Sequence, residues 1–273
     1  MPDTRPPEAA SDAPVVDDGK NGFSISFGGS GSGVTGQASG FSLGRHASPP
    51  VDPMSDPDKL AAIGKMVRER LEARGDAEYL GNGKADLYRI RGFLDRNECR
   101  RLVKVIDRKI GPSTLFKGTE IDGFRTSSTH YFAAGDPDTT ALETKIDALL
   151  GLPHMLAETT QGQRYMAGQQ FKHHQDFFHE TEAYWQDERR RGGQRTWTAM
   201  VYLNEPEEGG ATDFKDVGVA IPPERGAIIV WNNMGRDGRP NHQTLHAGTP
   251  VIAGSKYVIT QWYRLFPWSI EQR

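Results

Sequence analysis

The half of the sequence that follows Gly151 consists of short runs rich in β-branched and aromatic residues, and this pattern restricts the possible folds most strongly. Several of these runs alternate apolar and polar residues with a period of two, which is typical of strands that bury one face. Glycine, proline, asparagine and charged residues separate the runs. They cover residues 162–171, 195–204, 218–223, 226–233 and 255–265. The sequence therefore predicts antiparallel strands throughout this half.

The preceding part of the chain carries helical patterns instead. Residues 55–75 predict a helix, because Leu60, Ile63, Met66, Val67 and Leu71 recur at helical spacing. Residues 95–111 predict a second helix that starts with a capping box, and residues 138–151 a third. Residues 85–94 predict a short strand between the first two helices. Helices followed by strands favour an α+β fold, mainly β, with the helices packed against an antiparallel sandwich or barrel.

The first 54 residues have a different composition. They are rich in proline, glycine, serine and aspartate, with GGSGSGVTGQASG at their centre. Such a segment contains too few large apolar residues to offset the entropy lost on folding. We therefore expect a disordered tail over residues 1–54 and one folded domain over residues 55–273. A linker or a partner-binding arm is the alternative interpretation of the tail.

Charge and cysteine content exclude several classes of function. The formal net charge of −3 offers no broad basic field, so we expect no nucleic-acid partner. No apolar run approaches the length of a membrane-spanning helix, and the first residues lack the pattern of a secretory signal, so we expect no membrane partner. The single cysteine, Cys99, excludes an intramolecular disulfide and a cysteine-based zinc site. A cytoplasmic location is the resulting expectation.

The stretch FKHHQDFF, which begins at Phe171, contains a candidate metal site. On a strand, residues two apart point to the same side, so His174 and Asp176 could share one metal. Two histidines and one carboxylate hold iron in non-haem oxygenases and leave positions open for other ligands. The third ligand must come from elsewhere, and His242 and His246 are the candidates. A charged turn at the surface is the alternative interpretation of this short pattern.

Lys256 is the second unusual residue. Strand alternation places Lys256, Val258, Thr260 and Trp262 on one face of their predicted strand. An unpaired ammonium costs several kcal/mol to bury, so a lysine on a buried face requires an anionic partner. The alternative is a lysine near a strand end whose ammonium reaches water.

Four segments, in order, resemble the prolyl 4-hydroxylase branch of the Fe(II)/2-oxoglutarate dioxygenases, and they span roughly residues 91–264. The segment RYMAGQQFKHHQDFF is similar to that family's Y-x-x-G-Q-x-Y-x-x-H-x-D-x-F pattern. It supplies Tyr165, Gly168, Gln169, Phe171, His174, Asp176 and Phe178. The segment LHAGTPVIAGSKYVITQWYR is similar to a second signature, with His246, Lys256 and Trp262. VYLNEPEEGGATDF and the FRTSS of residues 124–128 resemble two further segments of the family.

This resemblance implies a fold and a set of ligands. The implied fold is a double-stranded β-helix (a cupin-like jelly roll) with N-terminal helices packed on one sheet. The implied metal ligands for Fe(II) are His174, Asp176 and His246, which leaves His173, His179 and His242 as neighbouring groups. The implied contacts of the co-substrate 2-oxoglutarate are Lys256, Tyr165, Thr198 and Tyr202, although Tyr202 could equally be a core residue. For the substrate, the implied contacts are Arg125, Ser127 and Trp262.

The implied activity is hydroxylation of peptidyl proline, with formation of succinate and CO2. It requires O2 as well, and ascorbate is expected to restore oxidised iron. No catalytic residue is expected beyond the metal site, because the metal and the co-substrate supply the chemistry. The expected partner is a proline-containing protein or peptide. Hydroxylation of another residue or of a small molecule is one alternative, and a non-catalytic metal-binding module is another. The chain departs from the family pattern at Phe171, where a tyrosine is usual, so one hydroxyl is missing there.

Overall fold

A computed structural model describes residues 51–113 and 123–268. The expectation of a disordered segment over residues 1–50 lies outside the described residues. The helices are α1 (Pro57–Glu72), α2 (Arg96–Arg108), α3 (Thr140–Leu150) and α4 (Trp185–Glu188), with short 3-10 turns at Pro53–Ser55, His154–Leu156 and His242–Thr244. The strands are β1 (Ala77–Tyr79), β2 (Leu87–Ile90), β3 (Gly111–Pro112), β4 (Ser128–Tyr131), β5 (Gln161–Met166), β6 (Phe171–His174), β7 (Arg195–Tyr202), β8 (Glu208–Gly209), β9 (Thr212–Phe214), β10 (Val219–Ile221), β11 (Ile228–Asn232), β12 (His246–Gly248), β13 (Val251–Ala253) and β14 (Ser255–Arg264).

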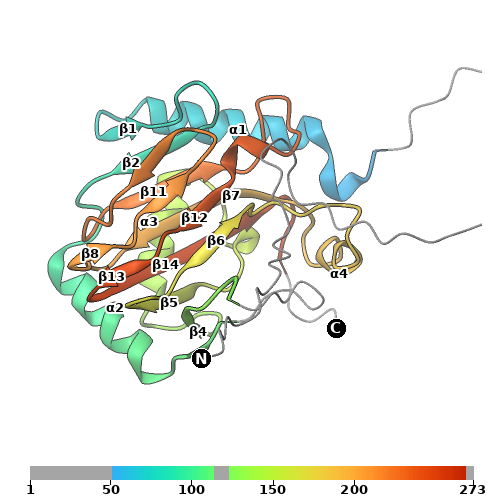
Figure 1. The fold of residues 1–273 in the computed structure, drawn as a ribbon. Coiled ribbons are helices and arrows are strands. Elements are labelled where there is room, and N and C mark those ends of the chain that lie inside the picture. Colours follow the sequence, from blue (N-terminus) through green and yellow to red (C-terminus); the bar gives the residue numbers. More distant parts are fainter. Residues whose placement is uncertain (1–50, 114–122, 269–273) are drawn as a thin grey trace, which may run out of the picture. The chain divides into compact units, whose positions relative to one another are not determined.

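The strands form antiparallel sheets, which makes the fold mostly β (Figure 1). Within the described residues the larger sheet has the order β1-β2-β11-β7-β14-β5-β4-β3, and a smaller sheet has the order β10-β9-β12-β6. A short pair, β13-β8, joins neither of them. The antiparallel arrangement agrees with the expectation from the sequence. The strand β4 was not expected, because no alternating run was identified over residues 128–131.

Helices α1 and α2 begin where the sequence predicts, whereas the short helix α4 was not expected. At α1 the Asp56 side chain accepts hydrogen bonds from the backbone N–H groups of Asp58 and Lys59, and at α2 Asp95 and Glu98 form the expected capping box. These contacts satisfy N–H groups that have no partner within a helix.

Alternating residues of the large sheet face two different cores. On β7, Trp197, Ala199 and Val201 belong to a core shared with residues of α1, α2 and α3. On the same strand, Met200 and Tyr202 face a second core, to which Phe214 of the smaller sheet contributes. The large sheet is therefore covered by helices on one face and by the smaller sheet on the other. The cavity residues Tyr165, Met200 and Lys256 come from this second face of the large sheet, and His174 and His246 come from the smaller sheet that covers it.

The ordered region begins earlier than the predicted domain boundary. Asp52 accepts hydrogen bonds from Trp185 Nε1 and Arg189, both at 3.2 Å, and the Met54 carbonyl accepts one from Gln194 N at 2.9 Å. Residues 52–54 therefore contact the domain, although the sequence placed them in the tail. Their composition resembles that of the tail, and contacts with residues so distant in sequence cannot be read from composition. Among the described residues, no helix combines the length and the apolar character needed to span a bilayer.

Candidate metal centre and co-substrate pocket

His174 and His246 are direct neighbours across two strands. They are register partners in the antiparallel pair β6–β12, and their ring centroids lie 4.3 Å apart. His174 Nδ1 lies 2.8 Å from the Lys172 carbonyl and His246 Nδ1 lies 2.9 Å from the Thr244 carbonyl. Each carbonyl accepts a hydrogen bond from Nδ1–H, which fixes the tautomer and leaves Nε2 available as a metal ligand.

Asp176 completes the cluster, but it does not lie on a strand. Strand β6 ends at His174, so the strand alternation from which we paired His174 with Asp176 does not apply. A bend after β6 brings the carboxylate back instead. Its Oδ1 lies 3.6 Å from His174 Nε2 and 3.9 Å from His246 Nε2.

The two oxygens of Asp176 have different surroundings. Oδ2 accepts hydrogen bonds from Trp262 Nε1 and from the Thr198 hydroxyl, each at 2.8 Å. Oδ1 faces the two imidazoles. Because Oδ2 is already committed to two donors, Asp176 can offer one oxygen to a metal.

The electrostatics of the cluster suit a divalent cation. Burial, followed by the neighbouring His246, lowers the pKa of His174 to about 3, so the imidazole is neutral and its lone pair is available. Burial alone would raise the pKa of Asp176, but His246 and His174 hold it below its ordinary value. The three ligand atoms lie within 4.8 Å of one another. Two imidazoles and one carboxylate are a donor set that fits Fe(II).

Aromatic rings hold both imidazoles in place. Phe171 stacks on His174 with a centroid distance of 3.6 Å and an interplanar angle of 15°. Phe214 and Trp231 pack against His246 at 5.2 Å and 4.9 Å. The departure from the family pattern at Phe171 therefore retains the stacking on His174.

Lys256 is buried in the same cavity as the cluster. Its side chain is 2% exposed, and burial lowers its pKa to about 7. The ammonium lies 5.5 Å from the ring centroids of both Tyr165 and Tyr202. Within the part of the chain that the structure describes, no carboxylate forms an ion pair with it. A buried cation beside a candidate metal centre would be stabilised by an anionic ligand.

Two expected co-substrate contacts have other roles. Thr198 donates to Asp176 and accepts from Asn233 Nδ2 at 3.0 Å, so its hydroxyl serves the metal cluster and not the lysine end of the cavity. In the register of β7 and β14, Thr198 pairs with Trp262, six residues from Lys256, which corresponds to about 20 Å along a strand. The assignment of Thr198 to the distal carboxylate was wrong for this reason.

Tyr202 lies close to Lys256, yet its hydroxyl is engaged elsewhere. It donates to Thr212 Oγ1 at 2.7 Å, and the ring is fully buried. This fits the alternative in which Tyr202 is a core residue. Tyr165 pairs with Lys256 in the register of β5 and β14 and lines the cavity, as the co-substrate assignment requires.

The three expected substrate contacts occupy different places. Arg125 lines the cavity with its guanidinium 4.9 Å from the Phe171 ring centroid. Ser127 is 3% exposed, and its hydroxyl lies 2.8 Å from that of Ser113. Trp262 lines the cavity, but its N–H is used by Asp176. Arg125 and Ser127 lie in one family-like segment and Trp262 lies in another, and neither segment shows which of its side chains face the cavity.

Two neighbouring histidines, His173 and His242, have partners outside the cluster. His173 Nε2 lies 3.0 Å from Asp213 Oδ2. His242 lies 3.2 Å from Gln175 and packs edge-on against Phe177. His246, and not His242, therefore supplies the second imidazole.

Sequence reasoning did not assign several residues of the cavity. They are Gln163, Met200, Thr212, Trp231, Val258, Thr260 and Gly248. Thr212 lies in the GGATDF segment, whose threonine matches the family pattern, and Thr260 shares the strand face of Lys256. Both residues could therefore have been identified as cavity residues from the sequence. Gln163 is identified only by the register, because β5 pairs it with Val258.

Comparison with known proteins agrees with this geometry. A family model described as "2OG-Fe(II) oxygenase superfamily" matches residues 160–264, which include the triad and Lys256. Prolyl 4-hydroxylase 2 of Arabidopsis thaliana is 29% identical over 197 residues, which are 63% of this chain and 64% of that protein. The chain thus spans slightly less than two thirds of this relative.

Two further relatives align with this chain over a larger share of their own length. Probable prolyl 4-hydroxylase 8 of Arabidopsis thaliana is 30% identical over 254 residues, which are 77% of this chain and 82% of that protein. The second is the viral collagen prolyl hydroxylase vCPH from Paramecium Bursaria Chlorella virus-1, whose crystal structure is a 2OG complex. Its sequence is 30% identical to this chain, and the two structures align with a TM-score of 0.51. The alignment covers 64% of this chain and 94% of vCPH. The chain therefore belongs to the 2OG-Fe(II) oxygenase superfamily, as a prolyl 4-hydroxylase-like member.

Proposed function

We propose that this chain is an Fe(II)- and 2-oxoglutarate-dependent dioxygenase that hydroxylates peptidyl proline. The observation that carries the proposal is that the triad of His174, Asp176 and His246 lines the same cavity as the buried Lys256. A structural metal site has no need of a buried ammonium beside it. A cavity for a metal-bound dicarboxylate needs one, because the distal carboxylate requires a cation.

The triad would hold Fe(II) through Nε2 of both histidines and Oδ1 of Asp176. Iron bound there together with 2-oxoglutarate and O2 supplies the oxidising chemistry that hydroxylates a C–H bond and yields succinate and CO2. The chain contributes the fixed ligand geometry. It also contributes the aromatic walls of Phe171, Phe214 and Trp231, which keep water away from the imidazoles. Ascorbate would restore iron that has become oxidised.

Lys256 would bind the distal carboxylate of 2-oxoglutarate. Tyr165, its cross-strand partner, and Thr212, which also lines the cavity, would add hydroxyl groups to this end. Arg125 and Phe171 would contact the peptide near the metal. A proline substrate is supported by the names of the relatives, which are prolyl 4-hydroxylases. Hydroxylation of another residue or of a small molecule is the alternative.

The finer features of the fold and of the chain belong to the same proposal. We infer that the two antiparallel sheets that enclose the site form a double-stranded β-helix. The folded catalytic unit would include Asp52 to Met54, which contact the domain, as well as the predicted domain from residue 55 onward. A cytoplasmic location is supported by the presence of a single cysteine, Cys99, since cytosolic proteins seldom rely on disulfides.

The proposal is tested by incubating the chain with Fe(II), 2-oxoglutarate, ascorbate and a proline-rich peptide. We expect the peptide to gain the mass of one oxygen atom while an equal amount of succinate forms. A matched peptide with alanine in place of proline should gain nothing. Succinate that forms in proportion to some other acceptor, with the proline peptide unchanged, would contradict the assignment of the substrate.

A further inference from the structure

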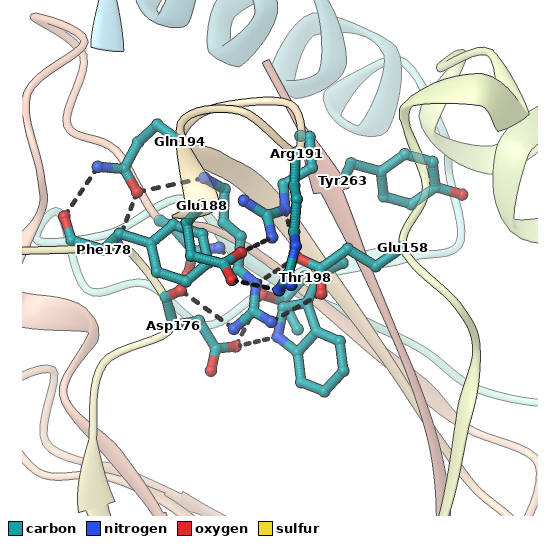
Figure 2. A network of polar contacts seen from close by, with 12 residues as sticks. Glu158, Asp176, Phe178, Glu188, Arg191, Gln194, Thr198 and Tyr263 are labelled. Carbon is teal, nitrogen blue, oxygen red and sulfur yellow. Dashed lines mark hydrogen bonds and ion pairs between the residues drawn. The ribbon is translucent and has the colours of Figure 1, made fainter. Parts of the chain in front are cut away.

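A buried network of charged side chains lies next to Asp176, one of the three candidate metal ligands (Figure 2). Glu158 accepts two hydrogen bonds from Arg195, at 2.6 Å and 2.8 Å, and one from Arg264 at 2.5 Å. All three residues are buried, with exposures of 8% or less. Arg264 also donates to Glu188, which pairs with Arg191 at 3.0 Å. The contacts thus combine two glutamates with three arginines.

The position of the two buried arginines explains why the glutamates are needed. Arg195 and Arg264 are register partners on the adjacent strands β7 and β14. Like charges directly opposite each other destabilise a sheet, and burial increases the cost of each unpaired charge. Glu158 lies between the two guanidinium groups and neutralises this repulsion. The network therefore holds Arg195 in one orientation.

Arg195 connects this network to Asp176 by two contacts. Its guanidinium lies 4.5 Å from the Trp262 ring centroid, and Trp262 Nε1 donates to Asp176 Oδ2. Its Nη1 also donates a long hydrogen bond of 3.4 Å to the Asp176 carbonyl. Arg195 thus contacts the backbone of Asp176 directly and its side chain through the indole.

Asp176 depends on such contacts because it lies outside the sheets. Strand β6 ends at His174, and residues 176–178 have no strand neighbour to fix them. The buried Gln194, next to Arg195, accepts a hydrogen bond from Phe178 N at 2.6 Å and donates one to the Phe178 carbonyl at 2.9 Å. Side chains at the start of β7 therefore replace the missing sheet pairing of this segment (Figure 2).

We propose that Arg195 is a positioning residue for the metal site, which fixes Asp176 as a ligand through Trp262 and through the Asp176 backbone. This inference rests on the proposed function, because it assumes that the triad binds a metal. A buried ion-pair network contributes little net stability compared with apolar side chains of similar volume. Its contribution here is the fixed position of Trp262 and of the Asp176 segment.

The test measures metal affinity with Co(II) as a redox-inert substitute for Fe(II), followed by its visible absorption. We expect Arg195→Met to raise the dissociation constant by about ten- to hundredfold, the usual effect of losing a group that orients a metal ligand. The cobalt spectrum should also change, because the carboxylate would no longer be held in one geometry. Arg195→Lys retains the charge but not the two parallel hydrogen bonds, and we expect it to restore part of the affinity.

Two controls separate positioning from stability. Arg191→Met removes an ion pair of the same network that does not contact Asp176, and its cobalt affinity should stay within about twofold of the wild type. Leu71→Ala removes a core side chain on α1 and should destabilise the fold without changing cobalt affinity.

The outcomes are distinguishable. If the wild-type chain binds no Co(II), the proposed function fails. If the wild type binds Co(II) and folded Arg195→Met binds it equally well with an unchanged spectrum, the network is structural and this inference is overturned. Should Arg195→Met not fold, Arg195→Lys decides in the same way, since unchanged affinity would overturn the inference and a weakened affinity would support it.

Discussion

Trp262 donates its indole N–H to Asp176 Oδ2 at 2.8 Å, so a residue that lies 86 positions later in the sequence fixes the orientation of the candidate carboxylate ligand. Thr198 donates to the same oxygen at the same distance. The carboxylate is thereby turned so that Oδ1 faces both imidazoles. Ligand geometry at this site is determined as much by these donors as by the ligands themselves.

Removal of either donor should weaken metal binding. We expect Trp262→Phe and Thr198→Val each to raise the dissociation constant for Fe(II), measured anaerobically, by about ten- to hundredfold. Thr196→Val is the matched control, because Thr196 lies on the same strand but donates to the Tyr263 carbonyl at 3.1 Å. Equal affinities for Thr198→Val and Thr196→Val would argue against this role of Thr198.

The metal cluster could be predicted from the sequence because short motifs carry its ligands. His174 and Asp176 lie two residues apart, and His246 is ten residues from Lys256, so the family pattern identifies all four. The stated reason for pairing His174 with Asp176 was nevertheless wrong, since β6 ends at His174. Spacing in a motif does not reveal whether a strand or a bend produces it.

The contacts of Thr198 depend on the register of two paired strands, and this register could not be predicted from the sequence. Thr198 shares a strand face with Tyr202, so alternation alone allowed both to approach Lys256. The antiparallel register of β7 and β14 places Thr198 opposite Trp262 instead. The network of Glu158, Arg195 and Arg264 was missed for a related reason, because its members lie far apart in sequence and form no motif.

Replacement of Lys256 should stabilise the ligand-free fold. Burial lowers its pKa from 10.5 to about 7, so below pH 7 the folded chain carries a buried charge at a cost of several kcal/mol. We expect Lys256→Met to raise the free energy of unfolding at pH 7 by about 1–3 kcal/mol, measured by urea denaturation. The gain should be largest below pH 7, decrease between pH 7 and pH 10.5, and disappear above pH 10.5, where the lysine is neutral in both states. A destabilised Lys256→Met protein at pH 6 would contradict this account.

Binding of 2-oxoglutarate should depend on pH through the same lysine. The bound carboxylate favours the protonated ammonium, so its pKa must rise when the co-substrate binds. Affinity should therefore be greatest below about pH 7 and fall by up to about tenfold for each pH unit above it. Calorimetric titration of the metal-loaded chain between pH 6 and 9 would measure this, with proton uptake as a second signal. An affinity that is constant over this range would show that Lys256 does not bind the carboxylate.

The close contact between β5 and α2 predicts an effect on stability. A Cβ atom at Gly162 would lie 2.5 Å from Ile106 Cγ1 and 3.2 Å from the Phe132 ring, and both side chains are fully packed. We expect Gly162→Ala to lower the free energy of unfolding by about 1–3 kcal/mol. Gly111→Ala, which meets no atom within 4 Å, is the control and should have little effect.

The central claim is that the triad binds iron and that Lys256 binds 2-oxoglutarate in the same cavity. Anaerobic titration with Fe(II) and then 2-oxoglutarate, carried out on the wild type, His174→Ala and Lys256→Met, tests it most directly. We predict that the wild type binds one iron and then one co-substrate, that Lys256→Met binds iron but loses the co-substrate, and that His174→Ala binds neither. Undiminished iron binding by His174→Ala, or undiminished co-substrate binding by Lys256→Met, would contradict the account.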